Sequence, residues 1–159
     1  MNAKKLILLP FLFVFTFALH ALDDFAYYSP NGQKVNLTKS DITSAAKNIK
    51  ALEKEFDKFE KKFEMGLVTA ENIEAELTQI FNKYGISESN AIAKFGVIAL
   101  GAEYAELKNE FTKKPKKLDF FNSIGIDPYA STKNLIHADD LEVIEKNLLA
   151  LAIIQDELD

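Results

Sequence analysis

The sequence predicts an all-α fold, a bundle of four to five helices with a long helical hairpin and a small N-terminal β-hairpin. Beyond residue 40, apolar residues recur every three or four positions over most of the chain, which is the spacing of one helix face. Gly66 and Gly85 end the first two of these runs, as glycine commonly ends helices. Only residues 22–38 combine short apolar runs with a Ser-Pro-Asn-Gly turn, the pattern of a hairpin.

Residues 1–21 have the layout of a secretory signal peptide. Lys4 and Lys5 precede an apolar run over residues 6–19, and Ala21 precedes an acidic pair. The run is shorter than the about 20 apolar residues that span a bilayer, so we expect a cleaved leader and not an anchor. The sequence has no cysteine, and an exported chain without disulfides fits a bacterial periplasm. Residues 22–159 then have the length of a single domain.

The charge balance limits the classes of partner. Loss of the leader removes two lysines and no acid, which leaves 17 lysines against 24 acidic residues, a net charge of −7. So acidic a chain disfavours nucleic acid and anionic lipid surfaces as general partners. We therefore expect no nucleic-acid binding and no stable membrane insertion after cleavage of the signal peptide. The expected partner is another envelope protein or, by self-association, a second copy of the chain.

In order along the mature chain, residues 22–38 are expected to form the β-hairpin-like arm and residues 41–84 the helical hairpin. Thr38 or Ser40 can cap the first helix, because a hydroxyl accepts hydrogen bonds from free N–H groups of the first turn. The two helices are joined only by residues 66–68. So short a link makes them antiparallel neighbours.

The first helix carries its apolar residues in a heptad seam that ends in three phenylalanines. Residues 53–64 read EKEFDKFEKKFE, nine charged residues and three rings. A seam of this spacing is narrow and fits one or two partner helices. The rings either fill an internal core or bind another chain, and Gly66 places the last ring at the tip of the hairpin. We expect a gradient from structural to partner-binding along Phe56, Phe59 and Phe63.

Residues 88–111 are expected to form the central helix. Over residues 91–105 only two side chains are charged, and a helix that is apolar on nearly every face is usually buried on several sides. Gly96 and Gly101 lie within it. Glycine weakens a helix by about 1 kcal/mol relative to alanine. We therefore expect both glycines to allow a close approach of neighbouring helices.

Residues 118–159 are expected to contain the C-terminal helices, after a basic loop over residues 112–117. The loop is either a solvated linker or a contact for an acidic partner. The last helix is expected to begin near Asp139, where Asp139 and Glu142 fit a capping box, and to continue to the C-terminus. Its apolar residues exceed what a small bundle has to bury. We therefore expect a second partner-binding stripe at Leu148, Leu149 and Ile153.

Residue types that carry catalysis are scarce. Once the leader is removed, His137 is the only histidine, and the chain has no cysteine and no arginine. A serine–histidine–acid arrangement would have to use His137, and the Gly-x-Ser-x-Gly elbow is absent from the sequence. Zinc sites with two histidines or with thiolates are excluded. We assign no catalytic, cofactor-binding or metal-binding residue and expect no cofactor.

Two short motifs resemble those of periplasmic families. Glu88-Ser89 resembles the Glu-Ser pair of the lytic transglycosylases, which cleave peptidoglycan with one glutamic acid. Residues 96–99 read Gly-Val-Ile-Ala where that family has a Gly-Leu-Met-Gln-type segment. Leu77-Thr78-Gln79 is similar to the Leu-Thr-x-x-Gln signature of small helical periplasmic chaperones, with Phe81 in place of the signature's glutamine.

The sequence therefore predicts a non-enzymatic periplasmic protein-interaction or scaffold protein, of the kind that forms a small subunit of a larger cell-envelope assembly. The scarcity of catalytic residue types and the excess of apolar stripes both favour this function. The first alternative is a periplasmic chaperone-like holder of apolar segments. The second is a glutamate-dependent cell-wall hydrolase, which the Glu88-Ser89 resemblance would imply.

Export can be tested on the N-terminus of the native protein. We expect the purified protein to begin at or close to Leu22, because Ala21 is the small residue that precedes the acidic pair. Mass spectrometry of the intact chain and of its N-terminal peptide measures this. A membrane-bound protein that retains Met1 would show instead that residues 6–19 act as an anchor.

Overall fold

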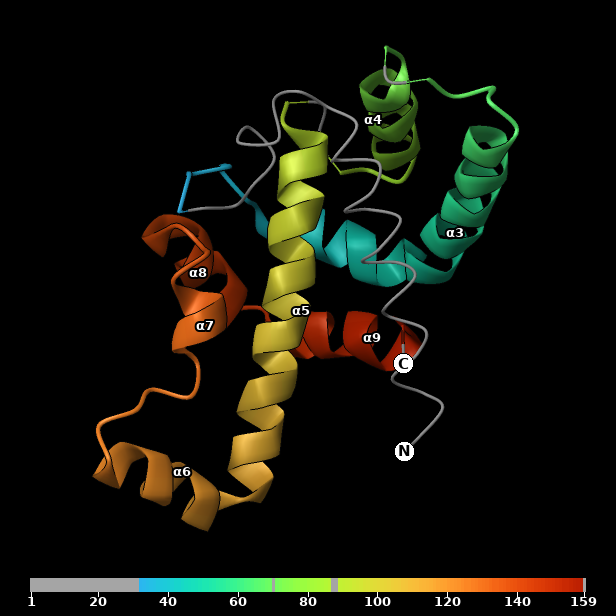
Figure 1. Cartoon of the computed structure of the whole chain (residues 1–159). Helices are drawn as coiled ribbons and strands as arrows, with labels where there is room; N and C mark the ends of the chain where they lie inside the picture. The colour runs from blue at the N-terminus through green and yellow to red at the C-terminus, as the bar shows by residue number, and fades with distance from the viewer. Residues whose placement is uncertain (1–31, 70, 87–88, 159) are drawn as a thin grey trace.

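A computed structural model describes residues 32–69, 71–86 and 89–158 (Figure 1). Within these residues the chain is all-α, as predicted, and contains no strand. Seven helices are present in this part of the chain: α3 (Lys39–Glu64), α4 (Ile73–Lys83), α5 (Ala91–Lys113), α6 (Pro115–Ser123), α7 (Ala130–Lys133), α8 (Ala138–Glu145) and α9 (Leu148–Leu158).

The expected β-hairpin lies mostly outside the described residues and stays a prediction. Its first strand and most of its turn precede Gly32, as does the whole of the expected signal peptide. The second half, residues 33–37, is described and belongs to no helix or strand. Val35 and Leu37 in this segment are buried and form part of the core.

α5 lies at the centre of the described part and packs against all six other helices (Figure 1). α3 and α9 lie against each other and both cross α5, whereas α7 and α8 lie along another side of it. The sequence explains this position, because α5 is apolar on nearly every face and can be buried on several sides. α6 is different, since it stands at the far end of α5, away from the rest of the bundle.

α3 and α4 form the expected antiparallel hairpin. Lys62 pairs with Glu76, and further along both helices Lys83 pairs with Glu55, so that residue numbers rise along one helix and fall along the other. Thr38 is the N-cap of α3. Its hydroxyl accepts from the Asp41 N–H while the Asp41 carboxylate accepts from the Thr38 N–H, which is a complete capping box.

The core is built around three rings from three helices. Phe56 of α3, Phe81 of α4 and Phe95 of α5 are all buried. Their ring centroids lie 5.6 Å apart for Phe56 and Phe81, 5.8 Å for Phe56 and Phe95, and 4.7 Å for Phe81 and Phe95. Aromatic pairs at these distances stabilise a core beyond the effect of burial alone. The rings therefore hold the hairpin onto the central helix.

A buried ion pair joins the N-terminal ends of α3 and α5. The Lys94 Nζ lies 3.3 Å from Asp41 Oδ2, and both side chains are almost fully buried. Because each charge is removed from water, its partner is needed to offset the loss of hydration. Asp41 thus serves twice, in the capping box of α3 and in the link to α5.

A second buried carboxylate holds the segment before α3. Asp140 in the first turn of α8 is 1 % exposed and accepts two backbone hydrogen bonds, from the Val35 N–H and the Leu37 N–H, both of 2.8 Å. The adjacent Asp139 pairs at the surface with Lys34, at 2.6 Å. The described residues before α3 are thereby fixed to α8, about 100 positions later in the chain.

The prediction of a basic loop over residues 112–117 is wrong. α5 continues to Lys113 and α6 begins at Pro115, so that Lys114 alone separates two helices. The proline explains the break, because it has no N–H to donate and its fixed φ suits the first position of a helix. It also disfavours a helical conformation of the residue before it, and Lys114 has φ −128° and ψ 62°.

The prediction of a single helix from near Asp139 to the C-terminus is also wrong, since α8 and α9 are separate helices. The backbone leaves the helix after Glu145, and the Asn147 side chain donates to the Val143 carbonyl at 2.7 Å. An asparagine that bonds to nearby backbone competes with the regular helix in this way. The N-cap of α8 is His137, and not Asp139 as expected, because its Nδ1 accepts from the Asp139 N–H at 3.2 Å.

The close approach expected at both glycines of α5 is confirmed for Gly101 and wrong for Gly96, so the two provide a matched pair of substitutions. A Cβ at Gly101 would lie 3.1 Å from Ile144 and 3.3 Å from Leu151, both fully buried, whereas a Cβ at Gly96 would meet nothing within 4 Å. We expect Gly96→Ala to raise the free energy of unfolding by about 1 kcal/mol through helix propensity. We expect Gly101→Ala to lower it by about 1–3 kcal/mol through overpacking.

Urea denaturation of the two variants and the native protein measures both changes. Equal gains in stability at both positions would contradict the close approach of α8 and α9 to Gly101.

Candidate interaction surfaces

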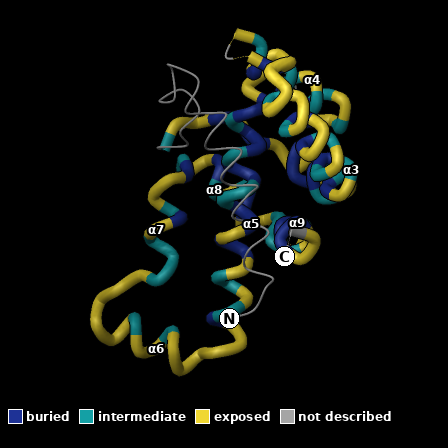
Figure 2. Tube along the Cα trace, turned by 45° about the vertical axis from the view of Figure 1, so that its right-hand side comes forward, coloured by how far each residue is buried: buried dark blue, intermediate teal, exposed yellow. Residues whose placement is uncertain are grey.

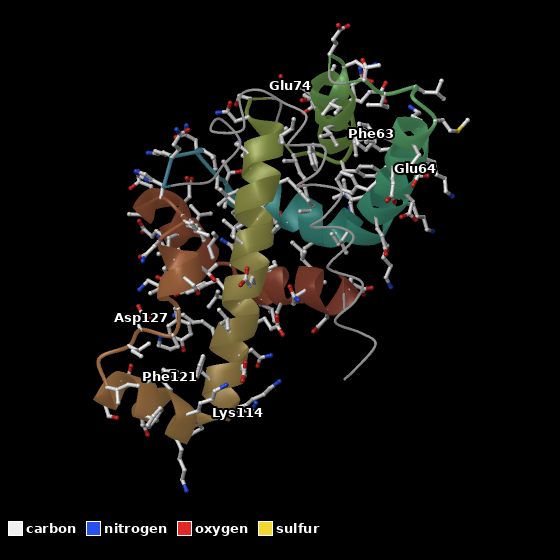
Figure 3. The ribbon with its side chains drawn as sticks, viewed as in Figure 1. Phe63, Glu64, Glu74, Lys114, Phe121 and Asp127 are labelled. Carbon is white, nitrogen blue, oxygen red and sulfur yellow. The ribbon has the colours of Figure 1, made fainter. Side chains whose placement is uncertain are left out.

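The three phenylalanines of the α3 seam do not share one environment. Phe56 and Phe59 are buried in the core, at 8 % and 2 % exposure, and are closed to a partner in this fold. Phe63 is only half-buried and packs against the edge of the core (Figure 3). Of the three residues for which we hypothesised partner binding, Phe56 and Phe59 are thus core residues, and Phe63 alone reaches the surface.

The turn between α3 and α4 exposes apolar and acidic side chains together. Met65 is 73 % exposed and Leu67 is 63 % exposed, although Val68 beside them is buried. Glu64 and Glu74 lie on the two helices that flank this turn (Figure 3), and both are exposed, as is Glu71. We call this group the turn surface: Met65, Leu67, Glu64, Glu71 and Glu74.

α9 has one buried side and one exposed side. Leu151 and Ile154 are fully buried towards α5 and α3. Leu149 is 82 % exposed and Ile153, one turn later, is 47 % exposed. Leu148 is half-buried against the core. Of the predicted stripe on this helix, Leu149 and Ile153 therefore form an exposed pair, which we call the α9 surface.

α6 presents a third surface, of which the sequence analysis considered only the lysines of residues 112–117 and missed the apolar residues. None of its residues is buried, and Figure 2 shows it as a mostly exposed segment at the end of the molecule. The Phe121 ring lies edge-on to Phe111 of α5 at 5.8 Å and attaches the helix. Phe120 in α6 and two apolar residues that follow the helix, Ile124 and Ile126, are exposed, as are the lysines of residues 113–117. We call this group the α6 end: Phe120, Ile124, Ile126, Lys113 and Lys116.

The four lysines of residues 113–117 are of two kinds. Lys114 and Lys117 both lie near Glu110 of α5, at 3.2 Å and 3.0 Å. Hydrogen bonds from Lys117 and Lys114 hold the pKa of Glu110 below its usual value. Lys113 and Lys116 are exposed and lie outside this pairing. The sequence signal for this surface was the spacing of four between Lys116, Phe120 and Ile124, which puts them on one helix face.

The ionisable groups inside the described part serve the fold. The buried Tyr104 hydroxyl donates to Glu145 at 2.8 Å, and burial raises the pKa of this tyrosine. His137 caps α8. Among the described residues, no group of three or more histidine or acidic side chains is placed to hold a metal ion. Glu88, on which the resemblance to lytic transglycosylases depends, lies outside the described residues.

Within the described residues, no helix combines the length and the apolar character needed to cross a membrane. Known protein families, curated proteins and solved structures contain no match to this chain. Inferences about its function therefore depend on the chemistry of its surfaces.

Because Phe56 is buried and Phe63 only half-buried, we expect their replacement by alanine to lower the free energy of unfolding by different amounts. Phe56→Ala removes a ring from the three-ring core and should lower the free energy of unfolding by about 3–5 kcal/mol. Phe63→Ala removes a half-buried ring and should cost about 1 kcal/mol. Urea denaturation of both variants measures the difference. An equal and severe loss at both positions would show that Phe63 belongs to the core.

Proposed function

We propose that this chain is a non-enzymatic interaction or scaffold protein of the periplasm, acting as a small subunit of a larger cell-envelope assembly. One observation carries the proposal. Seven of the eight large apolar side chains exposed in the described residues gather at three separate places: the turn surface, the α6 end and the α9 surface. Single exposed apolar residues are ordinary on a monomer, but gathered ones mark sites of contact.

The α9 surface is the best suited of the three to bind another envelope protein. Its backbone is held on the inner side by Leu151 and Ile154, so the exposed Leu149 and Ile153 are presented by a rigid helix. Residues that dominate binding energy usually lie at the centre of an interface and are surrounded by polar groups that exclude water. Exposed Asp156 and Glu157 follow on the same helix and provide part of such a rim.

The separation of the three surfaces favours a scaffold over a holder of unfolded chains. The α6 end and the turn surface lie at opposite ends of the molecule (Figure 3). One copy can therefore contact more than one neighbour at the same time. A holder would bind many unrelated segments weakly, whereas a scaffold binds one partner at a fixed stoichiometry. The two buried carboxylates are already used: Asp41 for the cap of α3 and the ion pair with Lys94, and Asp140 for backbone attachment.

The role of the α9 surface can be tested by replacing its apolar side chains with charged ones. We expect the double variant Leu149→Glu with Ile153→Glu to lose its partner, because two carboxylates would be buried without counter-charges. Its stability should change by about 0.5 kcal/mol or less, since both side chains are exposed. Crosslinking in intact cell envelopes, with quantified stoichiometry, measures the association. Leu135→Glu, at an exposed apolar residue outside the three surfaces, is the matched control and should crosslink as the native chain does.

A double variant that keeps the complete crosslinking pattern would contradict the role of the α9 surface. A native pattern of many unrelated proteins at low and variable ratios would favour the chaperone-like holder instead.

A further inference from the structure

The two ends of the molecule carry opposite charge. Residues 112–126, which include the α6 end, contain four lysines and one acid, a net charge of +3. Residues 60–76, which include the turn surface, contain five glutamates and two lysines, a net charge of −3. The overall negative charge of the chain is therefore unevenly distributed, and one end is basic.

Internal ion pairs leave exposed charge at both ends. At the turn, Lys62 pairs with Glu76 at 3.0 Å, and Glu64, Glu71 and Glu74 remain exposed. At the other end Glu110 pairs with Lys114 and Lys117. Two exposed lysines, Lys113 and Lys116, remain together with one exposed acid, Asp119. Each end thus offers apolar side chains with flanking charges of a single dominant sign.

The two ends are too far apart to meet within one copy. Figures 1 and 3 place the α3–α4 turn and α6 at opposite ends, with α5 running between them. α5 has 23 residues, which at about 1.5 Å each is a length of about 34 Å. Charges separated by more than the screening distance of about 8 Å at physiological salt act independently. The positive potential at the α6 end is therefore not cancelled by the acidic residues in the rest of the chain.

We propose that a second copy of this chain binds head to tail, with its turn surface against the α6 end of the first. Phe120, Ile124 and Ile126 would be covered by Met65 and Leu67. Lys113 and Lys116 would face Glu64, Glu71 and Glu74, so that charges of opposite sign meet at the rim. A symmetric contact of two α6 ends would instead bring lysines against lysines, and a contact of two turns would bring glutamates together.

A head-to-tail contact leaves one free end on each copy. Such heterologous contacts produce a closed ring when the rotation closes and an open chain when it does not. An anionic bilayer would also suit the basic α6 end, but it would leave the turn surface without a partner. A second copy covers both surfaces with one contact, which is why the observations favour it. This inference depends on the proposed interaction function but not on the α9 surface.

The contact can be tested with two complementary variants of the exported chain. The α6 variant carries Phe120→Gln and Ile124→Gln, and the turn variant carries Met65→Gln and Leu67→Gln. Each variant blocks one end and retains the other. In sedimentation velocity the native chain should form species larger than a dimer as its concentration rises, and less so at high salt. Each variant alone should self-associate at least about tenfold more weakly than the native chain.

The mixture of the two variants is the decisive sample. The α6 variant still offers an intact turn surface, and the turn variant still offers an intact α6 end, so the mixture should form dimers and nothing larger. The α9 double variant should self-associate as the native chain does, which separates this inference from the proposed partner site. All four residues are exposed, and denaturation midpoints confirm that the variants fold.

A second pair of variants tests the charges without changing the apolar residues. Lys113→Glu with Lys116→Glu should abolish self-association. Mixing that variant with a chain carrying Glu71→Lys and Glu74→Lys should restore species larger than a dimer. The native turn of the first chain can bind the native α6 end of the second, and the reversed charges attract again at the other pair of ends.

Three results would overturn the proposal. One is a native chain that remains monomeric at about 1 mM, a concentration at which even millimolar affinity is visible. Another is an α6 variant that self-associates as the native chain does. The third is a monomeric native chain that binds phosphatidylglycerol vesicles through Phe120, which would assign the α6 end to a bilayer.

Discussion

The burial of α5 is the constraint on which the rest of the described structure depends. A helix with so few charged residues is stable in water only when other helices cover it on several sides. Every other described helix contacts it, and α3, α4, α8 and α9 each contribute buried apolar side chains. The α3 seam, which was expected to fit one or two partner helices, belongs to a helix against which α4, α5 and α9 all pack.

Buried polar groups determine how this apolar assembly is ordered. Asp41 and Lys94 align the N-terminal ends of α3 and α5, and Asp140 fixes the backbone of Val35 and Leu37 to α8. Hydrophobic burial is non-directional, whereas a buried carboxylate is stable only where its donors are correctly placed. These groups therefore select one arrangement among the many in which the same apolar faces could meet.

The distribution of charge matters more for function than its total. The net negative charge argues against anionic surfaces for the molecule as a whole, yet α6 carries a basic and apolar group at one end. Because screening limits each charge to its neighbourhood, a partner at the α6 end meets mainly lysines. The same molecule presents glutamates at the α3–α4 turn. The two ends therefore carry charges of opposite sign. This asymmetry along the molecule would suit a component of an ordered assembly.

The sequence alone determined the helical class, the antiparallel α3–α4 hairpin and the dominance of α5, because apolar spacing, end signals and composition are properties of neighbouring residues. The sequence did not determine which phenylalanine rings of α3 are buried. Phe56 and Phe63 occupy the same seam position, but Phe56 meets Phe81 and Phe95 whereas Phe63 lies near the turn, beyond most of that cover. The role of Asp140 had no local signal, since its donors lie about 100 residues away. Likewise Phe120, Ile124 and Ile126 could not be assigned to the surface, because only the tertiary structure decides that α6 stands apart from the bundle. Burial depends on which distant segments come together, and that is settled by the packing of the whole chain.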